Sequence, residues 1–151
     1  MQNTRIAPTP LPQEYYPLIY IGLVDPTLQS HYQQVIRSLL YLSLGTCPDI
    51  AYAVAALAKQ SAPPLQEHLD KTLYICWYLL GTRHYFLVYD GATQAGMIGY
   101  ANADWGSDPN NCHSQTGWFI KLANCTFSWQ SYQQKHTVLS STEAECVIIW
   151  L

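Results

Sequence analysis

Charged residues are scarce in this 151-residue chain. Asp, Glu, Lys and Arg make up 11% of it, whereas a typical soluble domain has about 25%. Seven basic and ten acidic side chains give a net charge of −3, which argues against a free-standing nucleic-acid binder, because such proteins carry a basic patch. Hydrophobic residues make up 49% of the chain, which argues against intrinsic disorder. The composition therefore predicts a folded protein without an electrostatic nucleic-acid surface.

Long hydrophobic runs and paired cysteines are also lacking. The longest apolar runs, 50–58 and 73–80, are about half of the ~20 residues that a membrane-spanning helix needs. The N-terminus lacks the apolar core of a signal peptide. The five cysteines form no CxxC pair, so neither a zinc site nor a disulfide framework is indicated. We expect no membrane span and an intracellular location, cytoplasmic or nuclear.

The first half of the chain is predicted to be helical after an extended lead-in. Prolines crowd residues 1–25, and proline fixes φ and removes a hydrogen-bond donor. The spacing of apolar residues then predicts three short helices within residues 26–83. The first ends before Gly45, the second runs from Pro48 toward Pro63, and the third covers 67–80 and is stopped by Gly81.

The second half, residues 84–151, changes to strand patterns. The runs between turn residues predict strands over 84–89, 97–103, 115–122 and 125–130. A helix is expected to follow, because Ser and Thr at 140–142 precede Glu143 and then an apolar run. The aromatic residues of this half are expected to pack in the core and on the sheet: Trp105, Trp118, Phe119, Phe127 and Trp129.

A series of short strings, in order along the chain, resembles the end of a copia-type retrotransposon Pol polyprotein. At that point the reverse transcriptase gives way to a ribonuclease H (RNase H)-like region. The resemblance implies an α+β fold, with a small helical unit followed by a truncated RNase H-like β-β-β-α half-domain. The strings are RSLLYL at 37–42, TCPDIAYAV at 46–54, His68, YLLGT at 78–82, IGYANADW at 98–105, SQTGW at 114–118, SWQ at 128–130, Lys135 and LSSTEAE at 139–145.

The resemblance also implies a chemistry, which is cleavage of the RNA strand of an RNA–DNA hybrid with Mg²⁺. Two metals about 4 Å apart hold the attacking water and the leaving oxygen, and carboxylates hold the metals. Glu145 matches a carboxylate of the family, whereas Asn102 stands where the family has its first catalytic Asp. Asp104 is a weak substitute on the same strand face, and with Glu145 it is the candidate metal ligand. The family's remaining carboxylates are expected beyond Leu151.

We therefore expect a remnant of a copia-type polyprotein without catalysis of its own. It should need no cofactor, and its binding to an RNA–DNA hybrid should be weak or absent. One alternative is an RNase H that a partner chain completes. Another is a protein-interaction module that associates, with itself or a partner, through helix 73–80. This helix is apolar and aromatic where the family carries Lys and Arg, and Cys47 likewise replaces an Arg of the family.

Overall fold

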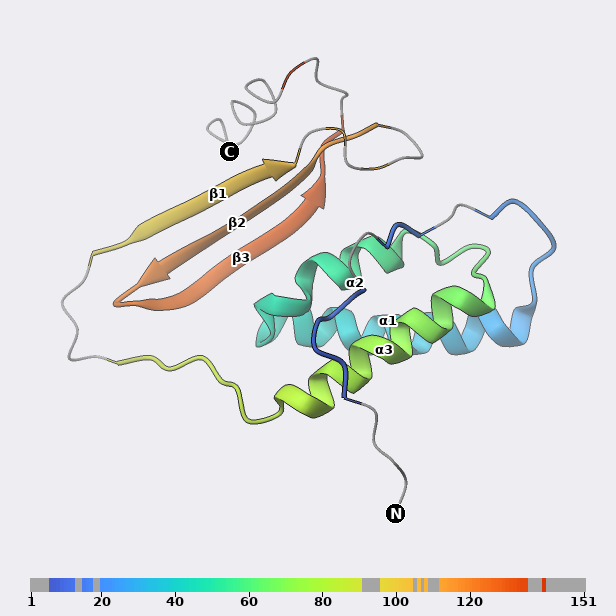
Figure 1. Cartoon of the computed structure of the whole chain (residues 1–151), viewed down its shortest axis with the longest axis horizontal. Helices are drawn as coiled ribbons and strands as arrows, with labels where there is room; N and C mark the ends of the chain where they lie inside the picture. Colours follow the sequence, from blue (N-terminus) through green and yellow to red (C-terminus); the bar gives the residue numbers. More distant parts are fainter. Residues whose placement is uncertain are drawn as a thin grey trace. The chain divides into compact units, whose positions relative to one another are not determined.

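The computed structural model describes residues 6–12, 15–17, 20–90, 96–104, 106, 108, 112–135 and 140. It divides the chain into two compact units, Met1–Phe86 and Leu87–Leu151. The described parts hold three α-helices and a three-stranded antiparallel sheet (Figure 1). The α+β fold class that the sequence predicts is therefore confirmed. No helix in these described parts is long and apolar enough to cross a membrane.

Helix α1, Pro26–Gly45, begins and ends close to where the sequence predicts. Asp25 is its N-cap, and the Asp25 carboxylate accepts from the backbone N–H of Thr27 at 2.9 Å and of Leu28 at 3.3 Å. Pro26 occupies the first turn, where its missing N–H has no helical partner to lose. The buried stripe of α1 is formed by Tyr32, Ile36 and Leu39.

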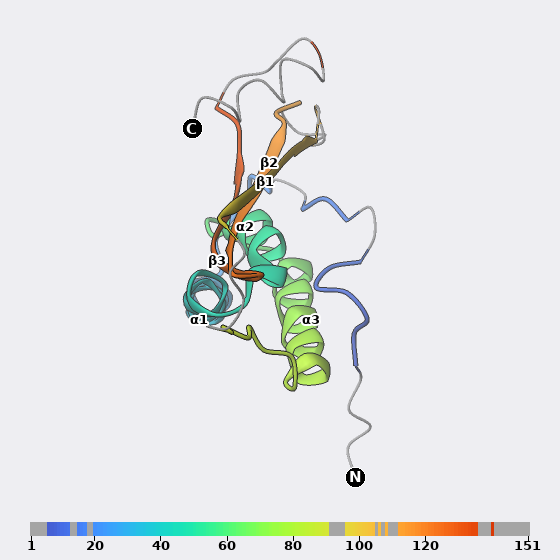
Figure 2. The same cartoon turned by 90° about the vertical axis from the view of Figure 1, so that its left-hand side faces the viewer.

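Two further helices complete the first unit. A short 3₁₀ helix η1, Pro48–Ile50, leads into α2, Ala51–Ala58. Helix α3, Gln66–Thr82, packs against both α1 and α2, and Figure 2 shows these two beside it with α1 almost end-on. Their shared core includes Ile50, Leu57 and Ile75, all fully buried.

The predicted stop of α3 at Gly81 is wrong, because the helix continues through Gly81 to Thr82. A Cβ atom at position 81 would overlap the side chain of Ile6. Glycine therefore lets the N-terminal segment lie close to the helix. The same segment contributes the buried residues Ala7 and Leu11, and Leu11 joins the helical core.

The second unit is built on strands β1 (Ile98–Asp104), β2 (Gln115–Leu122) and β3 (Cys125–Gln133), in the order β1-β2-β3. Strand β2 pairs with both neighbours, so Ala101 lies opposite Trp118, and Trp118 lies opposite Gln130. The strand predicted over 84–89 is not formed. Strand β1 is shifted by one residue from its predicted range, and β3 extends three residues beyond its predicted end, as far as Gln133.

Candidate functional site

The predicted site residues Asn102 and Asp104 both lie on β1, with exposed side chains. They are two residues apart on one strand and therefore share a face of the sheet. Asn102 lies opposite Gly117 on β2, and Asp104 lies opposite Gln115. Because Gly117 has no side chain, nothing on β2 covers the Asn102 amide from directly across the strand pair. The structure therefore places both residues where a ligand could reach them.

Amide and hydroxyl side chains occupy the rest of this end of the same face. The Gln115 Nε2 donates to the Ser131 Oγ at 2.9 Å, and Ser131 lies opposite Gly117 on the β3 side. The Gln133 Nε2 donates to the Asp108 Oδ2 at 2.7 Å. A neutral amide thus donates to Asp108, and neutral side chains lie beside Asp104 on the same face, whereas a dication site needs oxygen acceptors with negative charge.

The third predicted site residue, Glu145, lies outside the described residues, as do Glu143 and His136. The position of Glu145 relative to Asn102 and Asp104 is therefore outside what the structure describes. Within the described residues, no three His, Cys, Asp or Glu side chains stand close enough together to hold a metal ion. The carboxylate of Asp104 is thus the one predicted ligand whose surroundings are known.

Sequence reasoning missed a buried polar cluster that supports the same end of the sheet from the opposite face. Thr116, Gln134 and Ser114 are almost completely buried. The Gln134 Nε2 donates to the Thr116 Oγ1 at 2.9 Å, and the Gln134 N–H donates to the Ser114 carbonyl at 2.8 Å. Polar residues in and beside a strand predict a solvent-facing surface. No sequence signal therefore indicated that these three residues are buried.

His113 is not an isolated loop histidine, because its Nδ1 lies 2.8 Å from the Gln134 carbonyl oxygen. This contact joins the loop before β2 to the end of β3. Its neighbour Cys112 is exposed and has a φ of 55°, so the backbone turns sharply just before His113. The His113 contact and the turn at Cys112 are therefore both structural features of this loop.

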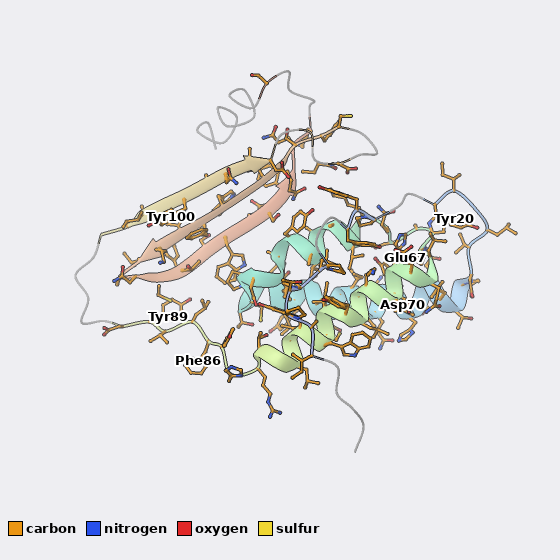
Figure 3. The ribbon with its side chains drawn as sticks, viewed as in Figure 1. Tyr20, Glu67, Asp70, Phe86, Tyr89 and Tyr100 are labelled. Carbon is orange, nitrogen blue, oxygen red and sulfur yellow. The ribbon has the colours of Figure 1, made fainter. Side chains whose placement is uncertain are left out.

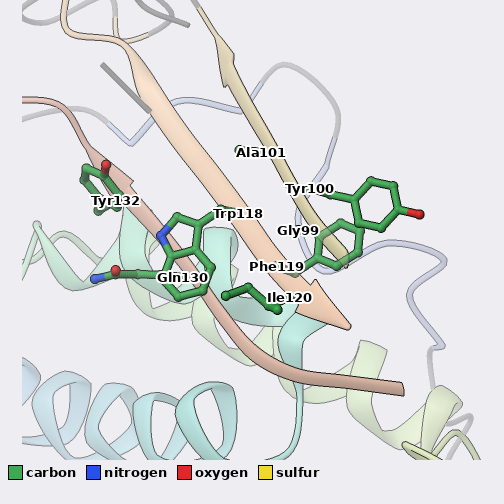
Figure 4. Close-up of a pocket in the computed structure, with 8 residues that line it drawn as sticks. All are labelled: Gly99, Tyr100, Ala101, Trp118, Phe119, Ile120, Gln130 and Tyr132. Carbon is green, nitrogen blue, oxygen red and sulfur yellow. The ribbon is translucent and has the colours of Figure 1, made fainter. Parts of the chain in front are cut away.

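A hollow of about 560 Å³ opens on the sheet face that carries Trp118 and Gln130 (Figure 4). Its lining includes Gly99 and Ala101, whose small size leaves the space over β1 open. On the other face the rings of Tyr100 and Phe119 stack, with centroids 4.8 Å apart and planes at 18°. Phe119 and Phe127 remain 39% and 44% exposed, so neither is a core residue, whereas the stacking of Phe119 on Tyr100 agrees with the expected packing on the sheet.

The apolar helix segment 73–80, the predicted association surface, is largely used inside the first unit. Leu73, Cys76 and Leu79 pack against the helical core. The Tyr78 hydroxyl donates to the Asp49 Oδ2 at 2.8 Å, and burial together with this carboxylate raises the pKa of Tyr78 to about 12. Leu80 is 44% exposed, so it is the residue of this segment most open to a partner.

The sequence is similar to those of several curated proteins. The chain is 36% identical over 145 residues to the retrovirus-related Pol polyprotein from transposon RE1 of Arabidopsis thaliana, covering 95% of this chain and 9% of the polyprotein. It is 35% identical over 128 residues to the Pol polyprotein from transposon TNT 1-94 of Nicotiana tabacum, covering 80% and 10%. It is 34% identical over 114 residues to the secreted RxLR effector protein 161 of Plasmopara viticola, covering 76% of this chain and 80% of that protein.

No protein-family model and no solved structure matches the chain. The chain spans about a tenth of the length of the Pol polyproteins that it matches, whereas it spans most of the effector protein. The match to the RE1 polyprotein covers 95% of this chain and therefore includes both helices and sheet. This chain belongs to the copia-type, retrovirus-related Pol polyprotein family.

Proposed function

We propose that this chain is a copia-type Pol segment whose RNase H-like part does not cleave nucleic acid by itself. The observation that carries the proposal is Asn102, which lies on β1 and which, by the resemblance, replaces the family's first catalytic Asp. An amide binds Mg²⁺ poorly and brings no negative charge to two dications. Glu145 keeps the family's carboxylate type, but one matched carboxylate does not neutralise two metals.

The surroundings of Asn102 support this proposal. Asp104 shares its face, and its strand neighbours on this face are the amides and hydroxyl of Gln115, Gln133 and Ser131. The Asp108 carboxylate at this end accepts from Gln133. Lys121 and Lys135 are the basic residues of the described sheet unit, too few to hold a polyanionic hybrid without help. We therefore propose that binding to an RNA–DNA hybrid is weak or absent.

The test is cleavage of the RNA strand of a labelled hybrid, with Mg²⁺ or Mn²⁺. We expect no cleavage by the unaltered chain, since the first metal ligand is missing. Cleavage that disappears in Glu145→Ala would overturn the proposal. Cleavage that persists in that variant is expected only from a contaminating nuclease.

The same assay decides whether a partner chain completes the enzyme. With the rest of a related Pol polyprotein added, a working composite site predicts that Asn102→Asp raises cleavage by a large factor, because the substitution restores the missing carboxylate. Asp104→Asn is the matched control, since it removes a charge from the same face. No activity in either the unaltered chain or Asn102→Asp excludes the composite enzyme.

A second candidate function, a protein-interaction module, is favoured by one comparison. The effector protein of Plasmopara viticola is matched over 80% of its length. A segment similar to this chain therefore makes up most of that relative. We propose that segment 73–80 would supply the contact, through Leu80 at the end of α3. Size-exclusion chromatography should then show association that Leu80→Glu abolishes and that Leu44→Glu, on α1, leaves unchanged. Equal elution of the unaltered chain and Leu80→Glu as monomers would contradict it.

A further inference from the structure

Another hollow, of about 290 Å³, lies within the helical unit. The N-terminal segment forms one wall, and η1 with the start of α2 forms the other. Leu11 belongs both to this lining and to the buried helical core, so the N-terminal wall is packed on the helices. The volume is close to the lower end of the range for small-molecule pockets. Besides the Asp49 carboxylate, the lining is mostly proline and tyrosine: Pro10, Pro12, Tyr15, Tyr16 and Tyr52.

The tyrosine rings make this hollow attractive to a cation. Aromatic faces carry partial negative charge and bind ammonium groups within about 6 Å of the ring centroid. The Tyr15 ring already does so, because the Lys71 Nζ lies 4.9 Å from its centroid. Tyr16 and Tyr52 are 39% and 43% exposed, so part of each ring is open to a ligand. These two rings are therefore the ones that a ligand cation can contact.

Negative charge lies at the same hollow. The Asp49 Oδ2 accepts the Tyr78 hydroxyl at 2.8 Å, and within the described residues no Lys, Arg or His side chain pairs with this carboxylate. On α3, where Figure 3 labels Glu67, the charges of Glu67 and Lys71 have opposite signs. Burial together with Glu67 raises the pKa of Tyr15 to about 12, so this hydroxyl stays neutral near pH 7. Asp49 therefore provides a negative charge for a ligand.

We propose that this hollow binds a small quaternary ammonium compound such as choline. The charged head contacts the rings of Tyr16 and Tyr52, and the Asp49 carboxylate is its counter-ion. The methyl groups of the head pack on the apolar surface of Pro10 and Pro12, which line the same hollow. Recognition of this kind combines a desolvated cation, aromatic faces and one anion.

The lining favours a quaternary ammonium over a primary one. A lysine-type ammonium has three N–H donors and needs acceptors for them. The charged acceptor here is the single carboxylate of Asp49, which already accepts from Tyr78. A quaternary ammonium has no N–H group, so it leaves no donor without a partner. Its methyl groups also suit a wall made of proline and tyrosine side chains.

The test is a titration of the full chain with choline, followed by the NMR signals of the choline methyl groups. We expect a Kd of about 1 mM or lower, an ordinary affinity for a ligand of this size. The neutral carbon isostere dimethylbutanol has the same shape without the charge. It should bind at least about tenfold more weakly, because the rings and Asp49 act on the charge.

Three variants locate the binding site. Asp49→Asn removes the charge but keeps an oxygen that can accept the Tyr78 hydroxyl, and Tyr16→Leu and Tyr52→Leu remove a ring but keep apolar bulk. Each should weaken choline binding by about threefold or more. Tyr41→Leu is the matched control, since Tyr41 lies on α1 outside the lining and is 81% exposed. It should bind choline like the unaltered chain.

Helical circular dichroism of each variant checks that the helical unit is folded, so that a loss of binding reports on the site. The proposal is overturned if choline does not bind at about 10 mM, or if dimethylbutanol binds as well as choline. It is also overturned if Tyr41→Leu weakens binding as much as Tyr52→Leu does. A trimethyllysine peptide that binds much more tightly than choline would assign the hollow to a protein partner instead of a small molecule.

Discussion

Replacing Ile75 by Ala is expected to destabilise the helical unit by about 2–5 kcal/mol, the usual range for removing a buried aliphatic side chain. Ile75 lies on α3 with no exposed surface, in the core that includes Ile36 and Leu57. Truncation removes its transfer free energy and leaves a cavity, because helices packed on three sides close up only in part. Domains of ordinary stability have a free energy of unfolding of about 5–15 kcal/mol, so a large share of the stability of the helical unit would be lost.

Thermal or urea unfolding followed by helical circular dichroism measures this loss. Leu44→Ala is the matched control, because Leu44 is an aliphatic residue on α1 that is 74% exposed. Its replacement should change stability by no more than about 0.5 kcal/mol. If Ile75→Ala unfolds at the same denaturant concentration as Leu44→Ala, Ile75 is not at the centre of the core that the structure describes.

Replacing His68 by Leu is expected to destabilise the same unit by about 1–3 kcal/mol, although a leucine fills a similar volume. His68 is fully buried near the start of α3. The ring Nδ1 of His68 accepts the Leu65 backbone N–H at 3.0 Å. The backbone N–H of His68 donates to the Leu65 carbonyl, also at 3.0 Å. This reciprocal pair satisfies groups that a helix N-terminus otherwise leaves without partners. Leucine offers no acceptor, so the Leu65 N–H would lose its bond.

His68→Gln separates the hydrogen bond from the packing. Glutamine at this position of a helix can reach back to the N-cap N–H, so it should lose clearly less stability than His68→Leu. Chemical denaturation of the three proteins side by side gives the ranking. A leucine variant as stable as the glutamine variant would mean that the bond to Leu65 contributes little.

Both predictions concern residues that stabilise the fold. This stabilising role is our explanation for the family resemblance in the helices. His68 belongs to the strings shared with copia-type polyproteins, and in the structure it holds the start of α3. Asn102, which by the resemblance replaces an Asp, lies on an exposed strand, where a change in charge does not disturb packing. Core positions are constrained by stability, whereas exposed positions are not.

Several features could be predicted from the sequence because their causes are local. The start of α1 follows from Asp25 and Pro26, which cap the helix within the first turn. Strands β1 and β2 fall within a residue of their predicted bounds, since turn residues flank alternating patterns. The pairing of β1, β2 and β3 was implied by the resemblance, and the structure confirms it.

Other features depend on contacts between distant residues, and the sequence misjudged them. Gly81 was expected to stop α3, but Ile6 packs against it and the helix continues. The run 84–89 has the residues of a strand and yet no strand forms there. A strand requires a neighbour for its backbone groups, and local β-propensity does not supply one.

By itself the sequence determined the α+β class and, through the resemblance, the family. Each of these is carried by residue type and short spacing. Only the tertiary structure decided that Asn102 lies opposite Gly117, that Thr116 and Gln134 form a buried polar cluster, and that Tyr89 contacts β3. The physical reason is that exposure and pairing belong to residues brought together from far apart in the chain, and a period of two does not say which face or edge meets a neighbour.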